Sequence, residues 1–347
     1  MKLSYFLNNA LSVNMAIDIG TNSTKIFIPQ KGLVLDEPSY IACDIHSGEV
    51  CAVGAAAKLM YEKAPCTVKV ITPIKNGVVA NHEMAQKMIR HFIASVCDKT
   101  LLKPRVVVSV PADSTDIEKR AVCDILREAG SREIYLIEAP LAAAAGAGCD
   151  ISLARGMLIA EIGGGRTNAA SISLGASVIK KSIPVAGNSM DAEIIKYVRK
   201  NHNLVIGSLT AENIKNTIGC VYPFELSKSM TVSGCDSSGG MPRSVILNSE
   251  EIREVLTPQV NKIAQLIKEV LEDTPPELQA DIMEDGILIT GGTAHLYGIE
   301  KHLKNELGLK VFITEGTDEC VVKGAAGELL KLDDATQKKF CYPIFEV

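Results

Sequence analysis

The sequence predicts an α/β protein built from two similar domains, and three observations carry this prediction. Short, uniformly apolar segments alternate with amphipathic helical segments, which is typical of helices layered on a sheet. Aromatic residues make up only 4% of the chain, so close-packed layers of Val, Ile, Ala and Gly are favoured over an aromatic-lined pocket. One strand–turn–strand motif occurs twice, and 347 residues suffice for two domains of roughly 100–200 residues each.

The expected strands are apolar runs bounded by turn residues. Residues 14–19 and 24–29 are expected to form two short strands on either side of a turn. Residues 105–111 (RVVVSVP) are so uniformly apolar that we expect a strand buried on both faces. The remaining expected strands span residues 156–162, 169–174 and 286–290.

The clearest helix begins after Thr115, because Thr115 and Glu118 form a capping box, and it ends at Gly130. Its expected apolar stripe consists of Ile117, Ala121, Val122, Ile125 and Leu126. The remaining expected helices span residues 82–97, 189–202, 210–218 and 250–272. Residues 234–242 (GCDSSGGMP) are expected to form either a surface hairpin tip or a disordered crossing.

Composition and charge exclude some classes of function. The formal net charge of −5, from 36 basic and 41 acidic residues, lacks the basic excess of a nucleic-acid groove, so no nucleic-acid partner is expected. The ten cysteines are scattered singly, without zinc spacing, which favours reduced thiols in a cytosolic protein. No apolar run reaches the roughly 18 residues of a transmembrane helix and no signal peptide is recognisable, so we expect a cytoplasmic protein.

The first thirteen residues, MKLSYFLNNALSV, have helical periodicity. One face of a short helix would carry Leu3, Phe6, Leu7, Ala10 and Leu11. This face would rest either on a membrane surface or on the body of the protein, and both alternatives stay open.

The duplicated motif is the most informative feature of the sequence. DIGTNST at 18–24 and EIGGGRT at 161–167 share an acid, an Ile, a Gly two residues after the acid, and a Thr six residues after it. Both copies follow an apolar strand. We therefore expect two similar domains that face each other across a cleft, with a nucleotide between them.

The residue types in both copies suit phosphate binding. Gly20 and the glycines at 163–165 let backbone N–H groups approach a phosphate, and Asp18 and Glu161 are placed to hold waters of a Mg²⁺ ion. The hydroxyls of Thr21 and Thr167 could add phosphate contacts. The alternative is that each Gly turn is purely structural, as in many tight hairpins.

A third glycine segment, ILITGGT at 287–293, ends an apolar strand and begins a helical pattern. It has neither the P-loop spacing nor GxGxxG, which excludes P-loop and Rossmann folds. Together with Glu212 and Lys215, one turn apart on another helix, it could close around a base and ribose. The alternative for Glu212 and Lys215 is a solvated i,i+3 ion pair.

These motifs resemble the MreB family, the bacterial actins of the actin, Hsp70 and hexokinase superfamily, almost from end to end. The resemblance rests on DIGTNST at 18–24, GLVLDEPSYIA at 32–42, PIKNGVVAN at 73–81, SVPADSTDIEKRAV at 109–122, YLIEAPLAAAAGAG at 135–148, EIGGGRTNAASISLG at 161–175, TAENIKNTIGCVYP at 210–223 and ITGGTAHLYGI at 289–299.

The resemblance implies an actin-like fold of two RNase H-like domains in four subdomains, with ATP or ADP and Mg²⁺ in the central cleft. Domain I would span residues 1–151 with a small insertion at 32–72, and domain II residues 152–317 with an insertion at 187–248. Residues 318–347 would return to domain I. Subunits would join head to tail into protofilaments that pair and attach to the inner face of the cell membrane.

By the same resemblance, each site residue receives an expected role. The first phosphate motif contains Asp18, Gly20, Thr21 and Asn22, and the second contains Glu161, Gly163, Gly164, Gly165 and Thr167, with Asp18 and Glu161 on the metal. Glu212 and Lys215 would contact the ribose and base, and Gly291, Gly292 and Thr293 the adenosine. Leu101 and Leu102 lie where the family carries a membrane-inserting loop.

Several positions depart from the family pattern around the γ-phosphate. The family reads IEEP, with the second glutamate polarising the attacking water, whereas this chain has Glu138 followed by Ala139. Because general-base help is worth about 10²–10⁴ in rate, we expect nucleotide binding with slow hydrolysis. The family's DIGGGTTE has become EIGGGRTN, which places Glu161, Arg166 and Asn168 at changed positions. Arg166 would either contact phosphate oxygens or point into solvent. Asn81 replaces an acid, and Thr293 a third glycine.

The leading hypothesis is an ATP-binding protein with weak ATPase activity that forms membrane-associated cytoskeletal filaments for cell shape or motility. Its partners would be copies of itself, membrane lipid and other MreB paralogues. The changed site would suit a divergent paralogue such as those of wall-less helical bacteria. The alternatives on the same fold are a small-molecule kinase acting on a sugar or acid, for which no catalytic aspartate is recognisable, and a chaperone.

Overall fold

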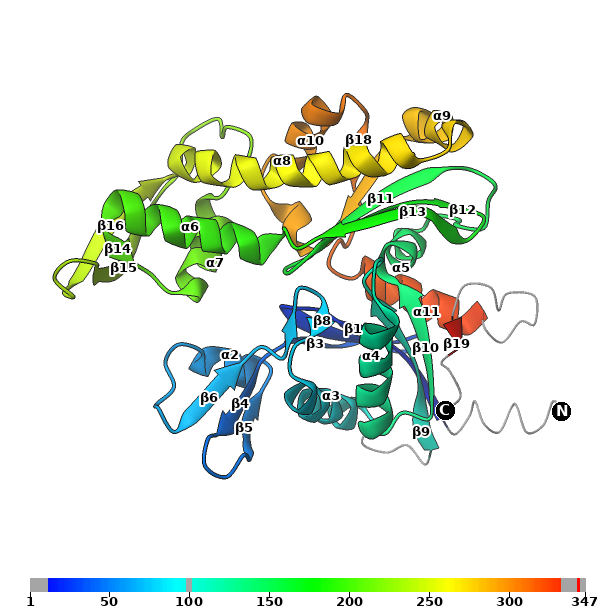
Figure 1. Cartoon of the computed structure of the whole chain (residues 1–347), viewed down its shortest axis with the longest axis horizontal. Coiled ribbons are helices and arrows are strands. Elements are labelled where there is room, and N and C mark those ends of the chain that lie inside the picture. The colour runs from blue at the N-terminus through cyan, green and yellow to red at the C-terminus, as the bar shows by residue number, and fades with distance from the viewer. Residues whose placement is uncertain (1–11, 98–101, 332–341, 344–347) are drawn as a thin grey trace. The chain divides into compact units, whose positions relative to one another are not determined.

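A computed structural model describes residues 12–97, 102–331 and 342–343 of the chain (Figure 1). The chain divides into two compact units. Unit 1 comprises Met1–Ala154, Ile172–Val178 and Asp318–Val347, and unit 2 comprises Arg155–Ser171 and Ile179–Thr317. Each unit contains a central sheet, a second and smaller sheet, and helices.

The central sheet of unit 1 has the strand order β19-β10-β9-β1-β2-β3. Its strands are β1 (Ser12–Ile19), β2 (Ser23–Ile28), β3 (Gly32–Pro38), β9 (Leu102–Val110), β10 (Glu133–Glu138) and β19 (Tyr342–Pro343). The first three strands form an antiparallel meander, and β9 and β10 continue the sheet in parallel with β1. The apolar run RVVVSVP therefore lies in β9, in the parallel centre of the sheet.

Both faces of this sheet are covered by helices, which explains the uniformly apolar β9 (Figure 1). Met15 and Val106 pack into the core beneath α3 (His82–Val96) and α4 (Asp116–Glu128). The opposite face, with the fully buried Val107, lies against α11 (Cys320–Lys331), which packs on α5 (Ala139–Gly146).

The capping box expected for α4 is confirmed, since the Thr115 hydroxyl accepts from the backbone of Glu118 and the Glu118 carboxylate accepts from the backbone of Thr115. One member of its expected apolar stripe is wrong. Ile117 is 83% exposed, because the buried face of α4 begins only at the second turn, with Cys123, Ile125 and Leu126.

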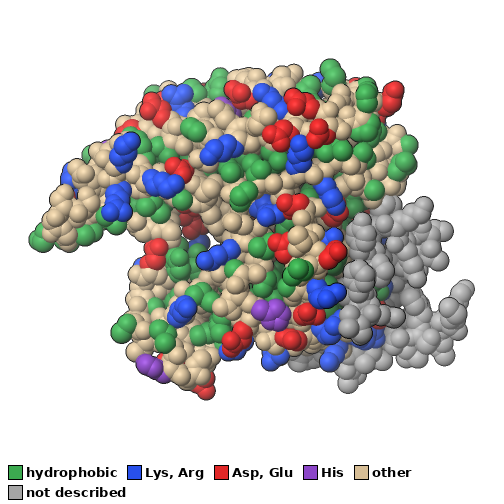
Figure 2. Space-filling model, in the orientation of Figure 1, with side chains coloured by type: hydrophobic (Ala, Val, Ile, Leu, Met, Phe, Trp, Pro, Cys, Tyr) green, Lys and Arg blue, Asp and Glu red, His purple; other side chains and the backbone are tan. Residues whose placement is uncertain are grey.

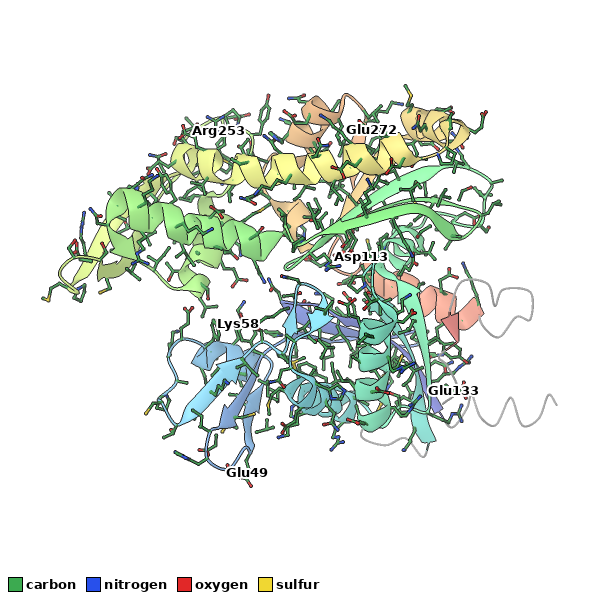
Figure 3. The ribbon with its side chains drawn as sticks, in the orientation of Figure 1. Glu49, Lys58, Asp113, Glu133, Arg253 and Glu272 are labelled. Atoms are coloured by element: carbon green, nitrogen blue, oxygen red, sulfur yellow. The ribbon has the colours of Figure 1, made fainter. Side chains whose placement is uncertain are left out.

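A small sheet in unit 1 follows β3. It consists of β5 (Val50–Val53), β4 (Ile41–Asp44) and β6 (Val68–Ile71), in that order, with α2 (Ala55–Met60) beside it. Glu49 precedes β5, and Lys58 projects from α2 with its ammonium 6.0 Å from the centre of the Tyr40 ring (Figure 3). The hairpin of β7 (Ile74–Lys75) and β8 (Val78–Val79) then leads into α3.

The central sheet of unit 2 has the order β13-β12-β11-β17-β18. Its strands are β11 (Met157–Ile162), β12 (Thr167–Ser173), β13 (Ala176–Ile183), β17 (Ile287–Thr290) and β18 (Val311–Ile313), of which β11, β17 and β18 are parallel. This order matches β3-β2-β1-β9-β10 of unit 1 strand for strand. The internal duplication that the sequence predicts is therefore present in the fold.

Helices and a smaller sheet complete unit 2. They are α6 (Gly187–His202), α7 (Ser208–Ile218), α8 (Ser249–Asp273), α9 (Pro276–Asp285), η1 (Gly292–His295), α10 (Ile299–Leu307), and the sheet of β14 (Leu204–Val205), β15 (Ser229–Asp236) and β16 (Pro242–Asn248). Residues 237–241 connect β15 to β16, so the loop-like stretch at 234–242 is a hairpin tip. The other helices expected from periodicity are confirmed to within two residues at each end.

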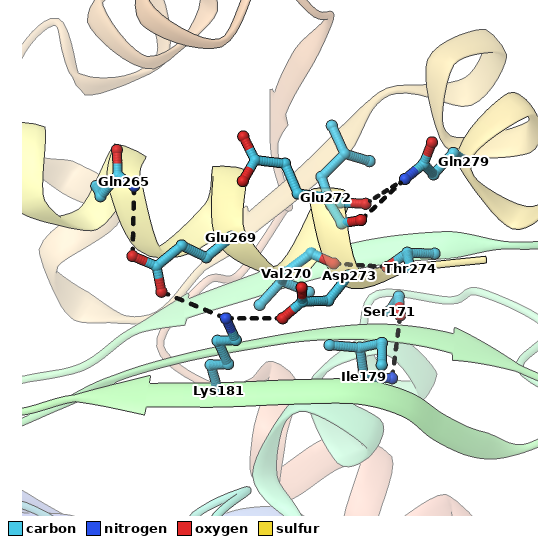
Figure 4. A network of polar contacts seen from close by, with 11 residues as sticks. Ser171, Ile179, Lys181, Gln265, Glu269, Val270, Glu272, Asp273, Thr274 and Gln279 are labelled. Carbon is cyan, nitrogen blue, oxygen red and sulfur yellow. Dashed lines mark hydrogen bonds and ion pairs between the residues drawn. The ribbon is translucent and has the colours of Figure 1, made fainter. Parts of the chain in front are cut away.

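The long helix α8 runs along the central sheet and is tied to it by ion pairs (Figure 4). Lys181 on β13 lies 3.4 Å from Glu269 and 2.8 Å from Asp273, both on α8. At the end of the helix the Thr274 hydroxyl donates to the carbonyl of Val270. This clamp fixes β13 against α8.

Charge is mixed on the molecular surface. Over the face drawn in Figure 2, Lys and Arg side chains are interspersed with Asp and Glu. Within the described ranges, no helix is long and apolar enough to cross a membrane.

Candidate functional site

The first glycine turn joins β1 to β2 in unit 1, and its geometry requires glycine. A Cβ atom on Gly20 would lie 2.5 Å from the carbonyl oxygen of Ser23. The Gly20 carbonyl accepts a hydrogen bond of 2.7 Å from the hydroxyl of Ser39, which is fully buried and also bonds Thr24. The turn is therefore rigidly held from behind.

Asp18 lies at the end of β1 with its carboxylate anchored. The Ser109 hydroxyl on β9 donates to Asp18 Oδ1 at 2.6 Å. Burial raises the pKa of the Asp18 carboxyl above its ordinary value, although the hydrogen bond from Ser109 and the charge of Lys25, opposite it on β2, act to lower it. A nearby cation would stabilise the ionised form of a carboxylate in this position.

Thr21 links this turn to the β7–β8 hairpin, since its hydroxyl oxygen accepts a 2.9 Å hydrogen bond from the backbone N–H of Gly77. A hydroxyl that accepts one bond can still donate its proton, so Thr21 keeps one donor for a phosphate oxygen. The backbone carbonyl of Asn22 accepts from the N–H of Ser39.

The second glycine turn joins β11 to β12 in unit 2. The carbonyl groups of its first two glycines, Gly163 and Gly164, accept hydrogen bonds from the start of α6, and that of Gly163 also accepts one from η1. The Gly163 carbonyl accepts from the N–H of Gly187 at 3.2 Å and from the Thr293 hydroxyl at 2.7 Å. The Gly164 carbonyl accepts from the N–H of Asn188 at 2.7 Å.

These bonds fix the direction of the next two amides. In a planar trans peptide, the C=O and the following N–H point in opposite directions. The N–H groups of Gly164 and Gly165 are therefore both turned away from α6, toward the same side of the loop. Successive N–H groups presented in this way form an anion-binding concavity.

The third glycine segment, residues 291–293, packs against the end of β11 and the second glycine turn. Gly291 has a φ of 91°, and a Cβ there would lie 2.5 Å from the carbonyl oxygen of Ile162, so only glycine fits. Gly292 begins η1, and Thr293 then reaches the Gly163 carbonyl. Thr293, where the resemblance expects a third glycine, thus helps to hold the second glycine turn.

Lys215 belongs to the same cluster, but not in the way the sequence suggests. Its ammonium lies 2.9 Å from the Asp191 carboxylate and donates to the Gly187 carbonyl at 3.0 Å, and both charged side chains are only 11% exposed. The alternative prediction, a solvated ion pair between Lys215 and Glu212, is therefore wrong. Lys215 instead links α7 to the start of α6. Glu212 is half-buried on α7.

Glu161, at the end of β11, is held by a directional chain of hydrogen bonds. Asn168 donates from Nδ2 to Glu161 Oε2 at 2.6 Å, and its Oδ1 accepts from the Ser182 hydroxyl at 3.0 Å. Ser182 in turn accepts from Arg166 Nη1 at 3.1 Å. Arg166 is thus directed toward Ser182 on β13, and its partly buried side chain does not simply point into solvent.

Thr167 differs from the expectation that its hydroxyl faces a phosphate. The side chain is fully buried and its hydroxyl donates to the carbonyl of Val185 at 2.6 Å. Because that single proton is used, Thr167 anchors the β13–α6 connection instead.

Glu138 and Ala139 lie at the junction of β10 and α5 in unit 1. The Glu138 carboxylate accepts from the Ser177 hydroxyl at 2.7 Å. Ala139 is the first residue of α5 and is only 7% exposed. A methyl group therefore occupies the position at which the resemblance places a water-polarising carboxylate.

Most of the residues that the sequence analysis expects to contact a membrane cannot be placed in the structure. Leu3, Phe6, Leu7 and Leu101 lie outside the described residues. Leu102 is the first residue of β9, paired with Ser12, so it begins a strand and not a loop.

Sequence reasoning missed the residues that orient the site. Ser109, Ser182, Gly187 and Asn188 hold the acids and the second glycine turn, yet each belongs to an ordinary strand or helix start. The only local signal is the AGN sequence at 186–188, a break before the amphipathic pattern of α6.

Comparisons with known proteins agree with this geometry. Residues 12–337 match the family described as "MreB/Mbl protein". The chain is 39% identical over 327 residues to the cell shape-determining protein Mbl of Bacillus subtilis, covering 94% of this chain and 98% of the relative. It is 40% identical over 328 residues to the cell shape-determining protein MreB of Escherichia coli, covering 93% and 94%.

Solved structures give the same result. MreB5 of Spiroplasma citri bound to ADP superposes with a TM-score of 0.88 at 35% identity, over 94% of this chain and 98% of that one. The same protein bound to AMPPNP gives 0.87 at 35% identity, over 94% and 97%. A MamK double helical filament, at 18% identity, gives 0.78 over 91% and 98%, which shows a shared fold.

Proposed function

The chain belongs to the MreB/Mbl family of bacterial actin-like cytoskeletal proteins, and from this premise we propose that it binds an adenine nucleotide and polymerises into filaments that determine cell shape or drive motility. The observation that carries the proposal is the orientation of the second glycine turn. Its two successive N–H groups form an anion site that phosphate would fill.

Nucleotide binding is supported by the solved relatives, since MreB5 of Spiroplasma citri was crystallised with ADP and with AMPPNP. In unit 2, the 163–165 turn would bind phosphate oxygens through its N–H groups. In unit 1, the Thr21 hydroxyl would offer a donor that suits a phosphate oxygen. Glu212 on α7 and the η1 segment would contact the ribose and base.

A magnesium ion would accompany the nucleotide. Among the described residues, no group of three or more His, Cys, Asp or Glu could ligate a metal by itself. This fits Mg²⁺, which takes one or two carboxylates and completes its shell with water and phosphate oxygens. Glu161 in unit 2 would hold such waters, Asp18 is the corresponding acid of unit 1, and the ion would neutralise phosphate charge.

Hydrolysis would be slow because no carboxylate occupies position 139. Ala139 has no proton acceptor, and Glu138 uses its carboxylate to accept a hydrogen bond from Ser177. Loss of general-base help would lower turnover by about 10²–10⁴ while leaving binding intact. The protein would act as a weak ATPase.

Self-assembly is supported by family membership and by the fold that the chain shares with the MamK filament. We further propose that subunits join head to tail, that protofilaments pair, and that the filaments lie on the inner face of the cell membrane, where other MreB paralogues would be partners. The segments expected to touch lipid, around Leu3 and Leu101, would make that contact.

A paired assay tests the proposal. Sedimentable polymer and released phosphate would be followed over one time course with ATP and Mg²⁺, with ADP and no nucleotide as controls. We expect nucleotide-dependent polymer with little phosphate. Brisk phosphate release without polymer, either with or without anionic lipid vesicles, would contradict the filament role.

A further inference from the structure

The peptide between Gly163 and Gly164 determines where the Gly164 N–H points. Neither residue has a Cβ atom, so this peptide is freer to rotate than a peptide between larger residues. In an unrestrained turn, part of the population would present the carbonyl oxygen, and not the N–H, to an anion. A phosphate site at this turn is therefore preorganised only if other groups hold the carbonyl in one direction.

Three hydrogen bonds hold the first two carbonyls of the turn, and they are unequal. The Gly164 carbonyl accepts a bond of 2.7 Å from the N–H of Asn188. The Gly163 carbonyl accepts a longer bond of 3.2 Å from the N–H of Gly187, and a bond of 2.7 Å from the Thr293 hydroxyl. Of these three bonds, only the one from Thr293 comes from a side chain. The direction of the Gly163 carbonyl therefore depends on a hydroxyl group.

Thr293 is itself held firmly at this position. It is only 8% exposed, and its carbonyl accepts from the N–H of Leu296 within η1. A Cβ atom on Gly187 would lie 3.0 Å from Thr293 Oγ1 and 3.6 Å from the Cα of Gly164, so the hydroxyl, the start of α6 and the turn pack together. A hydroxyl has a single proton, and this one is directed at the Gly163 carbonyl.

We propose that Thr293 is a positioning residue for the phosphate of the bound nucleotide, because its hydroxyl holds the Gly163 carbonyl so that the Gly164 N–H faces a phosphate oxygen. The inference rests on the proposed function and deepens it. This role differs from the one that the resemblance implies, in which Thr293 contacts the adenosine. The two roles give different losses, since a group that acts only on phosphate recognition leaves the affinity for a nucleoside unchanged.

The experiment measures the dissociation constants of adenosine and of ADP with excess Mg²⁺, and takes their ratio as the phosphate factor. Thr293→Val removes the hydroxyl at nearly the same shape and should lower the phosphate factor about three- to tenfold, the effect of one hydrogen bond, with adenosine affinity unchanged. Thr293→Ala should lower it in the same way, whereas Thr293→Ser keeps the hydroxyl and should retain the full factor. A partly unfolded sample changes both constants equally and leaves the ratio unaffected.

The matched control is Thr257→Val on α8, where the hydroxyl also donates to a backbone carbonyl at 2.7 Å, that of Arg253, and its phosphate factor should not change. Equal weakening of adenosine and ADP in Thr293→Val is the result of a merely structural or an adenosine-contacting role, and it would overturn the proposal. So would a phosphate factor that falls as far in Thr293→Ser as in Thr293→Val. If the unsubstituted protein does not bind ADP, or binds it no more tightly than adenosine, the proposed function itself fails, which is a different result.

Discussion

Gly324 on α11 lies against Ala142 on α5 so closely that a Cβ atom at Gly324 would fall 1.8 Å from the Ala142 carbonyl oxygen. The contact is reciprocal, since a Cβ at Gly146 would fall 1.8 Å from the carbonyl oxygen of Cys320. The two helices of unit 1 therefore cross backbone to backbone, and glycine is required at both positions.

Gly324→Ala should destabilise the protein by about 1–3 kcal/mol, because the added methyl group forces the two helices apart. Urea unfolding measures the change. The matched control is Gly327→Ala on the same helix, where a Cβ has nothing within 4 Å. There the substitution should stabilise by about 0.5–1 kcal/mol, as alanine in a helix interior does. Equal effects at the two positions would contradict the close crossing.

Ala139→Glu should raise the rate of phosphate release at least about tenfold, because it returns a proton acceptor to the start of α5. Single-turnover phosphate release with ATP and Mg²⁺ measures it. Ala139→Gln introduces a side chain of the same size as glutamate but without the basic carboxylate, so its phosphate release should stay slow. If Ala139→Glu binds ATP but releases phosphate no faster, the block lies with Glu161, Arg166 or Asn168 instead.

Removing one partner of the Lys215–Asp191 ion pair should cost about 3–5 kcal/mol, because the other charge stays buried without its opposite charge. Lys215→Met and Asp191→Leu would be measured singly and together by urea unfolding. The double variant should recover most of the loss. Additive losses would mean that the two charges do not interact.

Alkaline pH should destabilise the fold partly through two buried thiols. Burial raises the pKa of Cys123 and of Cys220 from 9.0 to about 11. The unfolded chain releases these protons from about pH 9 upward, whereas the folded protein keeps them until about pH 11, so stability falls as the pH rises across this window. Below about pH 8 both states are protonated and the thiols have no effect.

Thermal unfolding midpoints between about pH 8 and pH 10.5 measure this prediction. Replacing both cysteines with alanine should flatten the decline. The control is Cys51→Ala, which removes an exposed thiol and should leave the slope unchanged. A slope that is the same in all three proteins would contradict it.

The sequence predicts the layers of this fold well because their signals are local. The capping box at Thr115, the uniformly apolar β9 and the hairpin tip at 237–241 each depend on neighbouring residues. Ile117 shows the limit of this reasoning, since helical periodicity assigns it to a face but does not say how far the neighbouring sheet extends over that face.

The glycines and acids of the site are predictable from spacing, whereas their polar partners are not. Thr167 and Lys215 bond to groups on other elements, Val185 and Asp191, which only the tertiary fold brings near. The same holds for Ser182, because its distance from Glu161 along the chain does not distinguish it from other serines. A hydroxyl or ammonium donates to an acceptor that the tertiary packing brings close, and the sequence does not show which acceptor that is.

The turn at 163–165 would bind the proposed phosphate with main-chain groups alone, so this site has no side chain whose replacement would abolish it. The side chains at 139, 166 and 168 could then change one by one while the proposed phosphate recognition persists. If the turn binds phosphate as proposed, ligand retention and catalytic turnover would be inherited separately in this molecule. Gene copies of such a protein can drift from fast to slow nucleotide cycling, and filaments of different lifetimes can arise, without passing through a form that has lost its ligand.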